Sequence, residues 1–323
     1  GTGIHRSALF TFRAGDLFGR IFGVGQLVCG IYLFLASIGF VLMVMGGTDT
    51  FTAVCLALSG ISTGGLQPFD GPLANVLSPF SAVVLAALCL GGAFNISVLW
   101  DVLRLRRWRP FIRLFSHVEH RGLLAIAGLL IVATVVFASV YNLGPGILDS
   151  VYFVSSAGYR YDVISLDMVP APILIATALI GGSALSTAGG IKVIRLLLLF
   201  RHLGTDIARL SHPSRVKPIQ FRGQVIEDNE FLSIWMYFFG YSLVFALGGL
   251  VLSAAGLDLQ DALATSAAAL GNIGPLLDMT LPSSGLRYED FSSTQMTLAA
   301  LLMLIGRVEV LVVLSLIIPS TWR

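Results

Sequence analysis

Long stretches without charge alternate with short polar segments along this chain. Five windows contain no Asp, Glu, Lys or Arg: residues 21–48, 71–100, 122–148, 168–191 and 231–257. A sixth apolar segment, residues 291–318, is interrupted only by Arg307 and Glu309. Each segment exceeds the roughly 20 residues that a helix needs to cross a bilayer. The pattern predicts an all-α polytopic membrane protein.

The apolar segments are arranged in a repeated unit. Each unit has a long span, a short apolar segment that ends in a glycine-containing turn, a second long span and a basic loop. The three units cover about residues 21–107, 122–210 and 230–318, and residues 1–20 precede them as a cytoplasmic or interfacial segment. The second span of the middle unit is expected to be broken.

The turns of the three units can be aligned. Alignment places Gly65, Gly158 and Gly274 in equivalent positions. The residue sixteen positions earlier is Asp49, Asn142 or Asp258, and each of these types is favoured at a helix N-cap. Each short segment is therefore predicted to be a capped half-helix that ends partway through the membrane. Its carbonyl end carries a negative partial charge, which attracts a cation.

The second span of the middle unit contains many small residues. They interrupt an otherwise apolar helix at Gly181, Gly182, Ser183, Ser186, Thr187, Gly189 and Gly190. At this depth, backbone without helical hydrogen bonds is tolerated only where it is buried in protein or lines a water-filled path. The broken span therefore indicates a protein that moves polar cargo.

Composition and charge agree with a membrane location. The chain is 56% hydrophobic and 12% charged, whereas an average soluble domain has about 25% charged residues. All Lys and Arg residues except Arg160, Arg287 and Arg307 lie in segments that share one face if the spans come in pairs. That face is cytoplasmic by the positive-inside rule. The basic loops are thus interpreted as topology determinants, with no nucleic acid as a partner.

Four strings carry a resemblance to a known family: SSAGY at 155–159, IGGSALSTAGGIKVIRLLLLF at 180–200, LGNIGP at 270–275 and GRVEV at 306–310. Together with the repeats, they resemble the Trk/Ktr/HKT superfamily of potassium transporters, and most closely its bacterial Trk-type membrane subunit. The resemblance implies repeated span–pore-helix–span units around a central pore, as in K⁺ channels. It also implies uptake of potassium, as the transported ion, across the cell inner membrane.

The resemblance assigns roles by position. The filter residues would be Ser62, Thr63, Gly64, Gly65, Ser156, Ala157, Gly158, Tyr159, Asn272, Ile273 and Gly274. Residues 181–190 would form a flexible gating loop below the filter, and Arg307 would project into the pathway. Members of the family have four repeats, so a further repeat is expected before Gly1. They assemble as homodimers and bind a cytosolic nucleotide-binding regulatory subunit, which here could meet loops 104–121 and 201–222.

Two departures from the family pattern lie beside the second turn. Arg160 and Tyr161 directly follow Tyr159, at positions where small hydroxyl residues are usual. A positive charge at the mouth of a cation pore is unfavourable, so the orientation of this loop is left open.

Arg307 lies deep in the last apolar segment. A charge at that depth costs at least about 2.5–3.5 kcal/mol unless it faces water or a partner. Glu309 is only two positions away and points about 200° around the helix. The free carbonyls of the gating loop are therefore the expected partner. The alternatives are that Arg307 extends to the cytoplasmic interface or pairs with a carboxylate between helices.

Other chemistry fits the sequence less well. Residues 60–64 match the GxSxG pattern of hydrolases, but they lack a strand–turn–helix context and a histidine on the same side. His117, Glu119 and His120 do not have standard metal-ligand spacing and are expected in a solvated cytoplasmic loop. The chain is therefore predicted not to be an enzyme and to hold no cofactor. The remaining alternative is a secondary transporter that binds an organic substrate at its discontinuous helix.

Overall fold

The computed structural model describes residues 17–104, 115, 117–138, 143–162, 166–211, 220–221, 224–225, 228–280 and 287–308. In this part of the chain, three helices are long and apolar enough to cross a membrane. They are α1 (Leu17–Met45), α6 (Val118–Ala138) and α10 (Asp228–Ala254). Each lies where the sequence places the first span of a repeat, and helix α1 already includes the last four residues of the segment 1–20.

The second spans differ from one repeat to the next. The first consists of α3 (Pro79–Ala93) and α4 (Ile96–Arg104), between which the chain bends by 112°. The second consists of α8 (Ala171–Leu179) and α9 (Val193–Ser211), with an intervening loop, as the glycines predict. The third is α13 (Ser293–Val308); Glu309 and the rest of the predicted span 291–318 lie outside the described residues.

The sharp bend between α3 and α4 lies within the charge-free window 71–100, where the sequence shows no sign of a break. At the bend, the Asn95 side chain accepts a hydrogen bond from the Ser97 amide at 3.0 Å, which satisfies the first turn of α4. The Ile96 amide donates to the Leu185 carbonyl, 3.1 Å away in the broken second span of the next repeat. Backbone groups released by the bend thus find partners from distant segments, which hydrophobicity alone does not reveal.

Three half-helices lie between the spans: α2 (Thr50–Ile61), α7 (Leu143–Val154) and α11 (Leu259–Gly271). Asp49 caps α2, and its carboxylate accepts from the amides of Phe51 and Thr52 at 3.1 and 3.3 Å. Asp258 occupies the same position before α11 but makes no side-chain capping bond. Asn142, the predicted cap of α7, lies outside the described residues.

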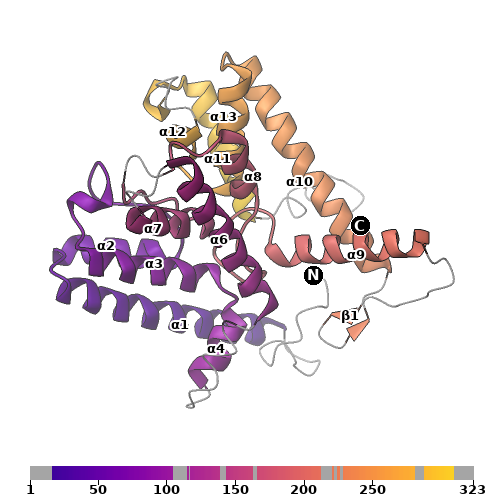
Figure 1. The fold of residues 1–323 in the computed structure, drawn as a ribbon. Coiled ribbons are helices and arrows are strands. Elements are labelled where there is room, and N and C mark those ends of the chain that lie inside the picture. The colour runs from indigo at the N-terminus through magenta and orange to yellow at the C-terminus, as the bar shows by residue number, and fades with distance from the viewer. Residues whose placement is uncertain are drawn as a thin grey trace.

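Figure 1 shows that the repeats follow one another in space. Helices α1, α2 and α3 contact one another, α6 packs on α7, and α11 lies between α10 and α13. Contacts of α7 with α3 and α8, and of α8 with α11, join the three groups. The remaining elements are short: η1 (Leu73–Asn75), α12 (Leu276–Thr280), η3 (Tyr288–Asp290) and an antiparallel pair of two-residue strands, β1 (Gln220–Phe221) and β2 (Gln224–Val225).

Two second spans approach the ends of half-helices closely because they carry glycine there. A methyl group on Gly92 of α3 would lie 2.2 Å from the Ile61 carbonyl oxygen of α2. A methyl group on Gly306 of α13 would lie 2.2 Å from the Leu270 carbonyl oxygen of α11. Any larger residue would push the span away, so glycine sets the distance between each span and its half-helix.

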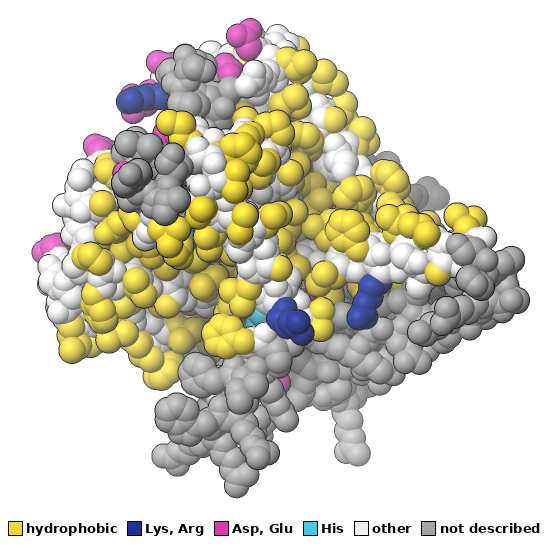
Figure 2. Space-filling model, in the orientation of Figure 1, with side chains coloured by type: hydrophobic (Ala, Val, Ile, Leu, Met, Phe, Trp, Pro, Cys, Tyr) yellow, Lys and Arg dark blue, Asp and Glu magenta, His cyan; other side chains and the backbone are white. Residues whose placement is uncertain are grey.

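The outer surface is strongly apolar. Exposed side chains such as Phe34, Leu129, Phe239 and Leu304 belong to helices from all three repeats. In Figure 2, yellow apolar side chains cover the middle of the molecule, most acidic side chains lie along its upper left edge together with one basic side chain, and two further basic groups lie below the middle. An apolar band between two polar edges is the surface that a bilayer covers.

Asp49 makes capping bonds and Asp258 does not, and this difference gives a stability prediction. Substitution Asp49→Ala removes the acceptor of two amides at the start of α2, so it should lower the free energy of unfolding by about 1 kcal/mol. Asp258→Ala is the matched control, because no capping bond is lost. Thermal unfolding in detergent should show a lower midpoint for Asp49→Ala than for Asp258→Ala. Equal midpoints would mean that the Asp49 bonds contribute nothing.

Candidate functional site

The three half-helices end with the same backbone conformation. Thr63, Ser156 and Asn272 have φ values of 50°, 57° and 56°, and they are the non-glycine residues with positive φ in the described chain. Each lies two positions before a glycine of the aligned turns. The left-handed conformation is uncommon for such residues and is particularly unfavourable for a β-branched one. The same unusual conformation at three aligned positions indicates that the turns are built to one plan.

Hydrogen bonds at the helix ends explain this conformation. The amides of Thr63, Ser156 and Asn272 each donate to the carbonyl three residues earlier, at 3.0–3.1 Å. Gly64 and Ile273 then donate to carbonyls five residues earlier, at 2.8 and 2.9 Å, which completes a Schellman motif after α2 and α11. After α7, the amide of Gly158 instead donates to the Tyr152 carbonyl at 3.0 Å. The second turn is therefore a variant of the other two.

Neighbouring turns touch one another. A methyl group on Gly65, whose φ is +67°, would lie 2.1 Å from the Ala157 carbonyl oxygen of the second turn. A methyl group on Gly158 would lie 3.1 Å from Pro275 and 3.3 Å from Ile273 of the third turn. The turns thus form a continuous row from the first repeat to the third. Gly274 borders open space, since a methyl group there would meet no atom within 4 Å.

The remaining residues predicted for the turns differ in exposure. Thr63, Ser156, Ala157, Tyr159 and Ile273 are buried. Ser62 and Gly64 of the first turn are exposed, and Asn272 and Gly274 of the third are partly exposed. The first and third turns are thus the open ends of the row, whereas the second turn is enclosed by both neighbours.

The loop between α8 and α9 has a hydrogen-bonded stem. Gly181 donates to the Ile191 carbonyl and Ile191 to the Leu179 carbonyl, both at 2.8 Å. Val193 donates to the Gly182 carbonyl at 3.1 Å. The stem strands are so close that a methyl group on Gly181 would lie 1.6 Å from the Gly189 carbonyl oxygen. Within the loop, Ser186 donates to the Ser183 carbonyl at 2.6 Å, and Gly190 has a positive φ of 73°.

The loop contacts all three turns. The Thr187 hydroxyl lies 3.1 Å from the Thr63 hydroxyl and 3.3 Å from the Ile61 carbonyl oxygen at the first turn. The Gly189 amide donates to the Ser156 hydroxyl of the second turn at 2.9 Å. A methyl group on Gly189 would lie 2.7 Å from the carbonyl oxygen of Gly271, next to the third turn. A loop predicted to be flexible is therefore hydrogen-bonded to the first two turns and lies against the third.

Lys192 was missed as a member of this site. The sequence groups it with the basic residues of a cytoplasmic loop, but its side chain is only 8% exposed. Its ammonium group donates to the Ala188 carbonyl, and to the Ser186 carbonyl at 3.4 Å. The sequence feature that could have identified it is its position directly after the uncharged residues Gly189, Gly190 and Ile191. A buried ammonium group that binds loop carbonyls holds them in place.

Arg307 contacts a different partner from the one predicted. Its guanidinium group donates to the Ser62 carbonyl at 2.7 Å. The prediction of a bond to the gating loop carbonyls is therefore wrong. The physical reason is that Gly306 brings α13 close to the end of α11, so the next side chain reaches across to the carbonyl end of α2, where the helix dipole is negative. Arg307 thus joins the third repeat to the first.

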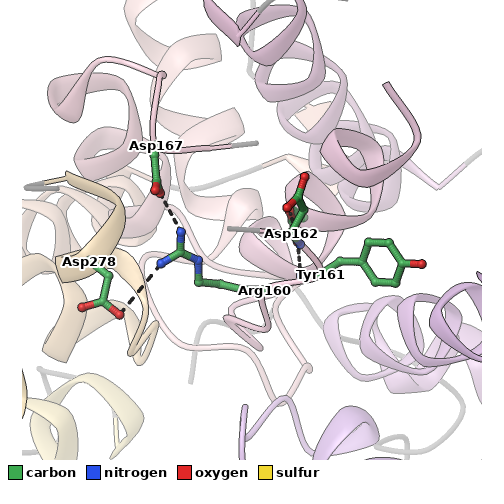
Figure 3. A network of polar contacts seen from close by, with 6 residues as sticks. Arg160, Tyr161, Asp162, Asp167 and Asp278 are labelled. Atoms are coloured by element: carbon green, nitrogen blue, oxygen red, sulfur yellow. Dashed lines mark hydrogen bonds and ion pairs between the residues drawn. The ribbon is translucent and has the colours of Figure 1, made fainter. Parts of the chain in front are cut away.

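The cation beside the second turn is neutralised. Arg160 lies 2.7 Å from the Asp167 carboxylate and 4.0 Å from that of Asp278 in α12. Figure 3 shows its guanidinium group between the two carboxylates. Burial raises the pKa of both Asp167 and Asp278, and the charge of Arg160 opposes that rise. Arg160 is thus a structural ion-pair partner beside the second turn.

Hydrogen bonds of the buried side chains of Asp149 and Tyr159 hold the second turn in place. The Asp149 carboxylate of α7 accepts from the amides of Tyr161 and Asp162, which fixes the segment that follows the turn. The Tyr159 hydroxyl donates to the Ser59 hydroxyl at 2.7 Å, and Ser59 accepts from the Leu66 amide at 2.8 Å. Tyr159 therefore braces the first turn as well as its own.

The segment around Glu119 is not a solvated loop, as the sequence had suggested. The side chains of Glu119 and His120 are 0% exposed at the start of α6. His120 stacks on Phe94 with ring centroids 4.3 Å apart, and its Nε2 accepts from the Asn95 amide at 2.9 Å. Within the described residues, no group of three or more His, Cys, Asp or Glu side chains could hold a metal ion. These residues are part of the protein interior.

Half-helices that end at a row of turns, next to a broken span in an apolar bundle, define a polytopic membrane protein of the pore-helix class. The family model for TrkH, described as a cation transport protein, matches residues 20–321. The chain belongs to this TrkH family. The prediction of an all-α, multi-pass protein of the cell inner membrane is confirmed.

Individual relatives support the assignment. The chain is 30% identical over 309 residues to the Trk system potassium uptake protein TrkH of Escherichia coli K12, covering 91% of this chain and 61% of that protein. It is 29% identical to TrkH of Halomonas elongata, covering 86% of this chain and 58% of the relative. The crystal structure of the potassium transporter TrkH from Vibrio parahaemolyticus superposes with a TM-score of 0.83 at 26% identity, covering 96% of this chain and 67% of that one. The chain thus spans about three fifths of the E. coli and H. elongata relatives.

The bracing by Tyr159 can be tested with a matched pair of variants. Tyr159→Phe removes a buried hydrogen bond between two turns, so it should lower the free energy of unfolding by about 1 kcal/mol. Tyr241→Phe is the control, because Tyr241 is 1% exposed and its hydroxyl has no hydrogen-bond partner in the described structure. Thermal unfolding should show a lower midpoint only for Tyr159→Phe. An equal effect of both changes would contradict the bracing role.

Proposed function

We propose that the protein takes up potassium through a central pore whose filter includes the three aligned turns. The observation that carries the proposal is the common register of Thr63, Ser156 and Asn272 at the ends of three half-helices. Half-helices that stop at one level direct their carbonyl ends, with negative partial charge, to the same place. Carbonyl oxygens in such turns replace the water around a cation.

The names of the relatives support potassium as the ion. Both TrkH relatives above are named as potassium uptake proteins, and the matched crystal structure is named as a potassium transporter. In this proposal, the carbonyl oxygens of the turns bind K⁺, and the chain holds no other cofactor. The row of turns is open beside Gly274, and a further repeat of the same kind completes the ring, as the resemblance to four-repeat transporters implies.

The loop from Gly181 to Gly190 acts in this proposal as the gate below the filter. Its support is the set of contacts that Thr187 and Gly189 make with the walls of all three repeats. A segment attached to every wall blocks the path between them. Because hydrogen bonds of non-helical backbone make up much of its attachment, it can be released without unfolding a helix.

The complete protein is proposed to work as a homodimer with a cytosolic nucleotide-binding regulatory subunit. The support is membership of the family and the names of the relatives, which describe a Trk system. The basic segments 104–121 and 201–222 face the cytoplasm in the predicted topology and are available to such a subunit.

The proposed function is tested by ion uptake into liposomes that contain the full-length protein. Uptake of rubidium-86, which replaces potassium, should exceed uptake in empty liposomes and should be reduced by excess unlabelled potassium. Excess sodium should compete less well. Uptake of labelled amino acids without any uptake of rubidium would favour the organic-substrate transporter instead.

Glycine at the second turn should determine ion selectivity. The φ of Gly158 is +69°, and a methyl group there would crowd Pro275 and Ile273. Gly158→Ala should therefore turn the neighbouring carbonyls and reduce the preference for rubidium over sodium by about tenfold or more. Gly128→Ala on α6 is the control, because its added methyl group meets no atom within 4 Å. Unchanged selectivity in folded Gly158→Ala protein would exclude Gly158 from the filter.

Arg307 should limit ion flow below the filter. Its guanidinium group lies at the carbonyl end of α2, where its charge repels a passing cation. Arg307→Gln keeps a hydrogen-bond donor for Ser62 but removes the charge, so uptake per molecule should rise at least severalfold. Arg287→Gln, at the exposed N-cap position before η3, is the control. If Arg307→Gln lowers the yield of folded protein and leaves uptake per molecule unchanged, Arg307 is only a structural link.

A further inference from the structure

Glu119 lies in the first turn of α6, away from the row of turns, and its carboxylate reaches the proposed gating loop. Oε2 of Glu119 accepts a hydrogen bond from the Ala184 amide at 3.0 Å. The same oxygen accepts from the side-chain amide of Asn95 at 3.3 Å. The Glu119 side chain is 0% exposed. A buried carboxylate that accepts from a backbone amide forms a strong, charge-assisted bond.

The residues around Glu119 join three segments that are distant in sequence. Asn95 lies at the bend between α3 and α4, and His120 binds the Asn95 amide through Nε2. The loop is fastened to the same bend by two further bonds, from the Ser183 amide to the Ala93 carbonyl at 2.9 Å and from the Ile96 amide to the Leu185 carbonyl at 3.1 Å. The start of α6, the bend and loop residues 183–185 therefore form one hydrogen-bonded cluster.

This cluster holds a different part of the loop from the part that meets the turns. Thr187 and Gly189 contact the turns, and Thr187 also donates to the Gly92 carbonyl of α3, whereas residues 183–185 contact the bend and α6. The bond from the Ala184 amide to Glu119 ties the loop to α6, at the second residue of that helix. A shift of the beginning of α6 would therefore act on the loop directly. The basic segment 104–117 comes immediately before this helix in the sequence.

We propose that Glu119 is a positioning residue that holds the gating loop closed, and that displacement of the start of α6 releases the loop. This inference rests on the proposed gating function of residues 181–190. Loss of the carboxylate leaves the amides of Ala184 and Asn95 without this acceptor in a buried place, so the closed position loses stability relative to the open one.

The experiment compares variants of the full-length protein in liposomes. Glu119→Ala removes the acceptor, Glu119→Gln keeps an acceptor oxygen for the Ala184 amide, and Glu119→Asp keeps the charge but shortens the side chain. Glu230→Ala is the matched control, since Glu230 lies in the first turn of α10, the corresponding span of the third repeat. A variant without residues 184–188 serves as the reference for an open path.

Two measurements are made on each variant: rubidium-86 uptake and hydrogen–deuterium exchange of the peptide that contains residues 181–192. Glu119→Ala should raise uptake by about tenfold and accelerate exchange in the loop, because a buried bond to a charged acceptor is lost. Glu119→Asp should have the same effects to a smaller extent. Glu119→Gln keeps the acceptor but loses the charge, so its uptake and exchange should lie between those of the wild type and Glu119→Ala. Glu230→Ala should match the wild type in both measurements.

The two measurements separate failure of this inference from failure of the gating function. If the loop deletion raises uptake but Glu119→Ala changes neither uptake nor exchange, the inference is wrong. If the deletion fails to raise uptake, the gating function is wrong, and unchanged exchange in Glu119→Ala would also refute the positioning role. If Glu119→Ala does not fold, the test uses Glu119→Asp instead. If the loop peptide of Glu119→Asp exchanges at the wild-type rate, the inference is wrong.

Discussion

The structure depends on one constraint: backbone polar groups inside a membrane need hydrogen-bond partners from the protein. The chain breaks its helices at the ends of α2, α7 and α11, at the bend before α4 and between α8 and α9. Each break releases amides and carbonyls. The described structure pairs them through Schellman bonds at the turns, a stem in the loop and side chains such as Ser156 and Glu119. The breaks therefore have to lie next to one another, because each supplies partners to the others.

This mutual dependence explains why the loop is well bonded although it is rich in small residues. Glycine removes side-chain bulk, so the backbone of Gly189 can approach the end of α11, and that of Gly181 can approach the opposite side of the stem. Close approach brings hydrogen-bonding groups together. The same small residues that suggest mobility in isolation thus produce a tightly connected segment here. A loop of this kind is held by a limited number of identifiable bonds, to which individual side chains contribute.

The cationic side chains near the turns and the loop are also paired with groups of the protein. Arg307 binds the carbonyl end of α2, Lys192 binds carbonyls of the loop, and Arg160 lies between two carboxylates. Each cation has a neighbour of negative or partly negative charge, which offsets the cost of removing it from water. The result is a row of turns whose neighbouring charges are fixed in place, so the electrostatic field along the proposed path is set by the fold.

The sequence by itself determined the membrane class, the three first spans, the register of the three turns and the position of the broken span. These follow from local properties: the length of apolar segments, the capping residues and the glycines. Only the tertiary structure decided that Arg307 reaches Ser62, that Glu119 and His120 are buried, that Lys192 belongs to the loop and that a second span bends at Asn95. Each of these depends on contacts between residues that are distant in sequence, up to 245 positions apart for Arg307 and Ser62. Hydrophobic periodicity indicates that a segment lies in the membrane, but the partner of a polar group there is set by which segments the packing brings together.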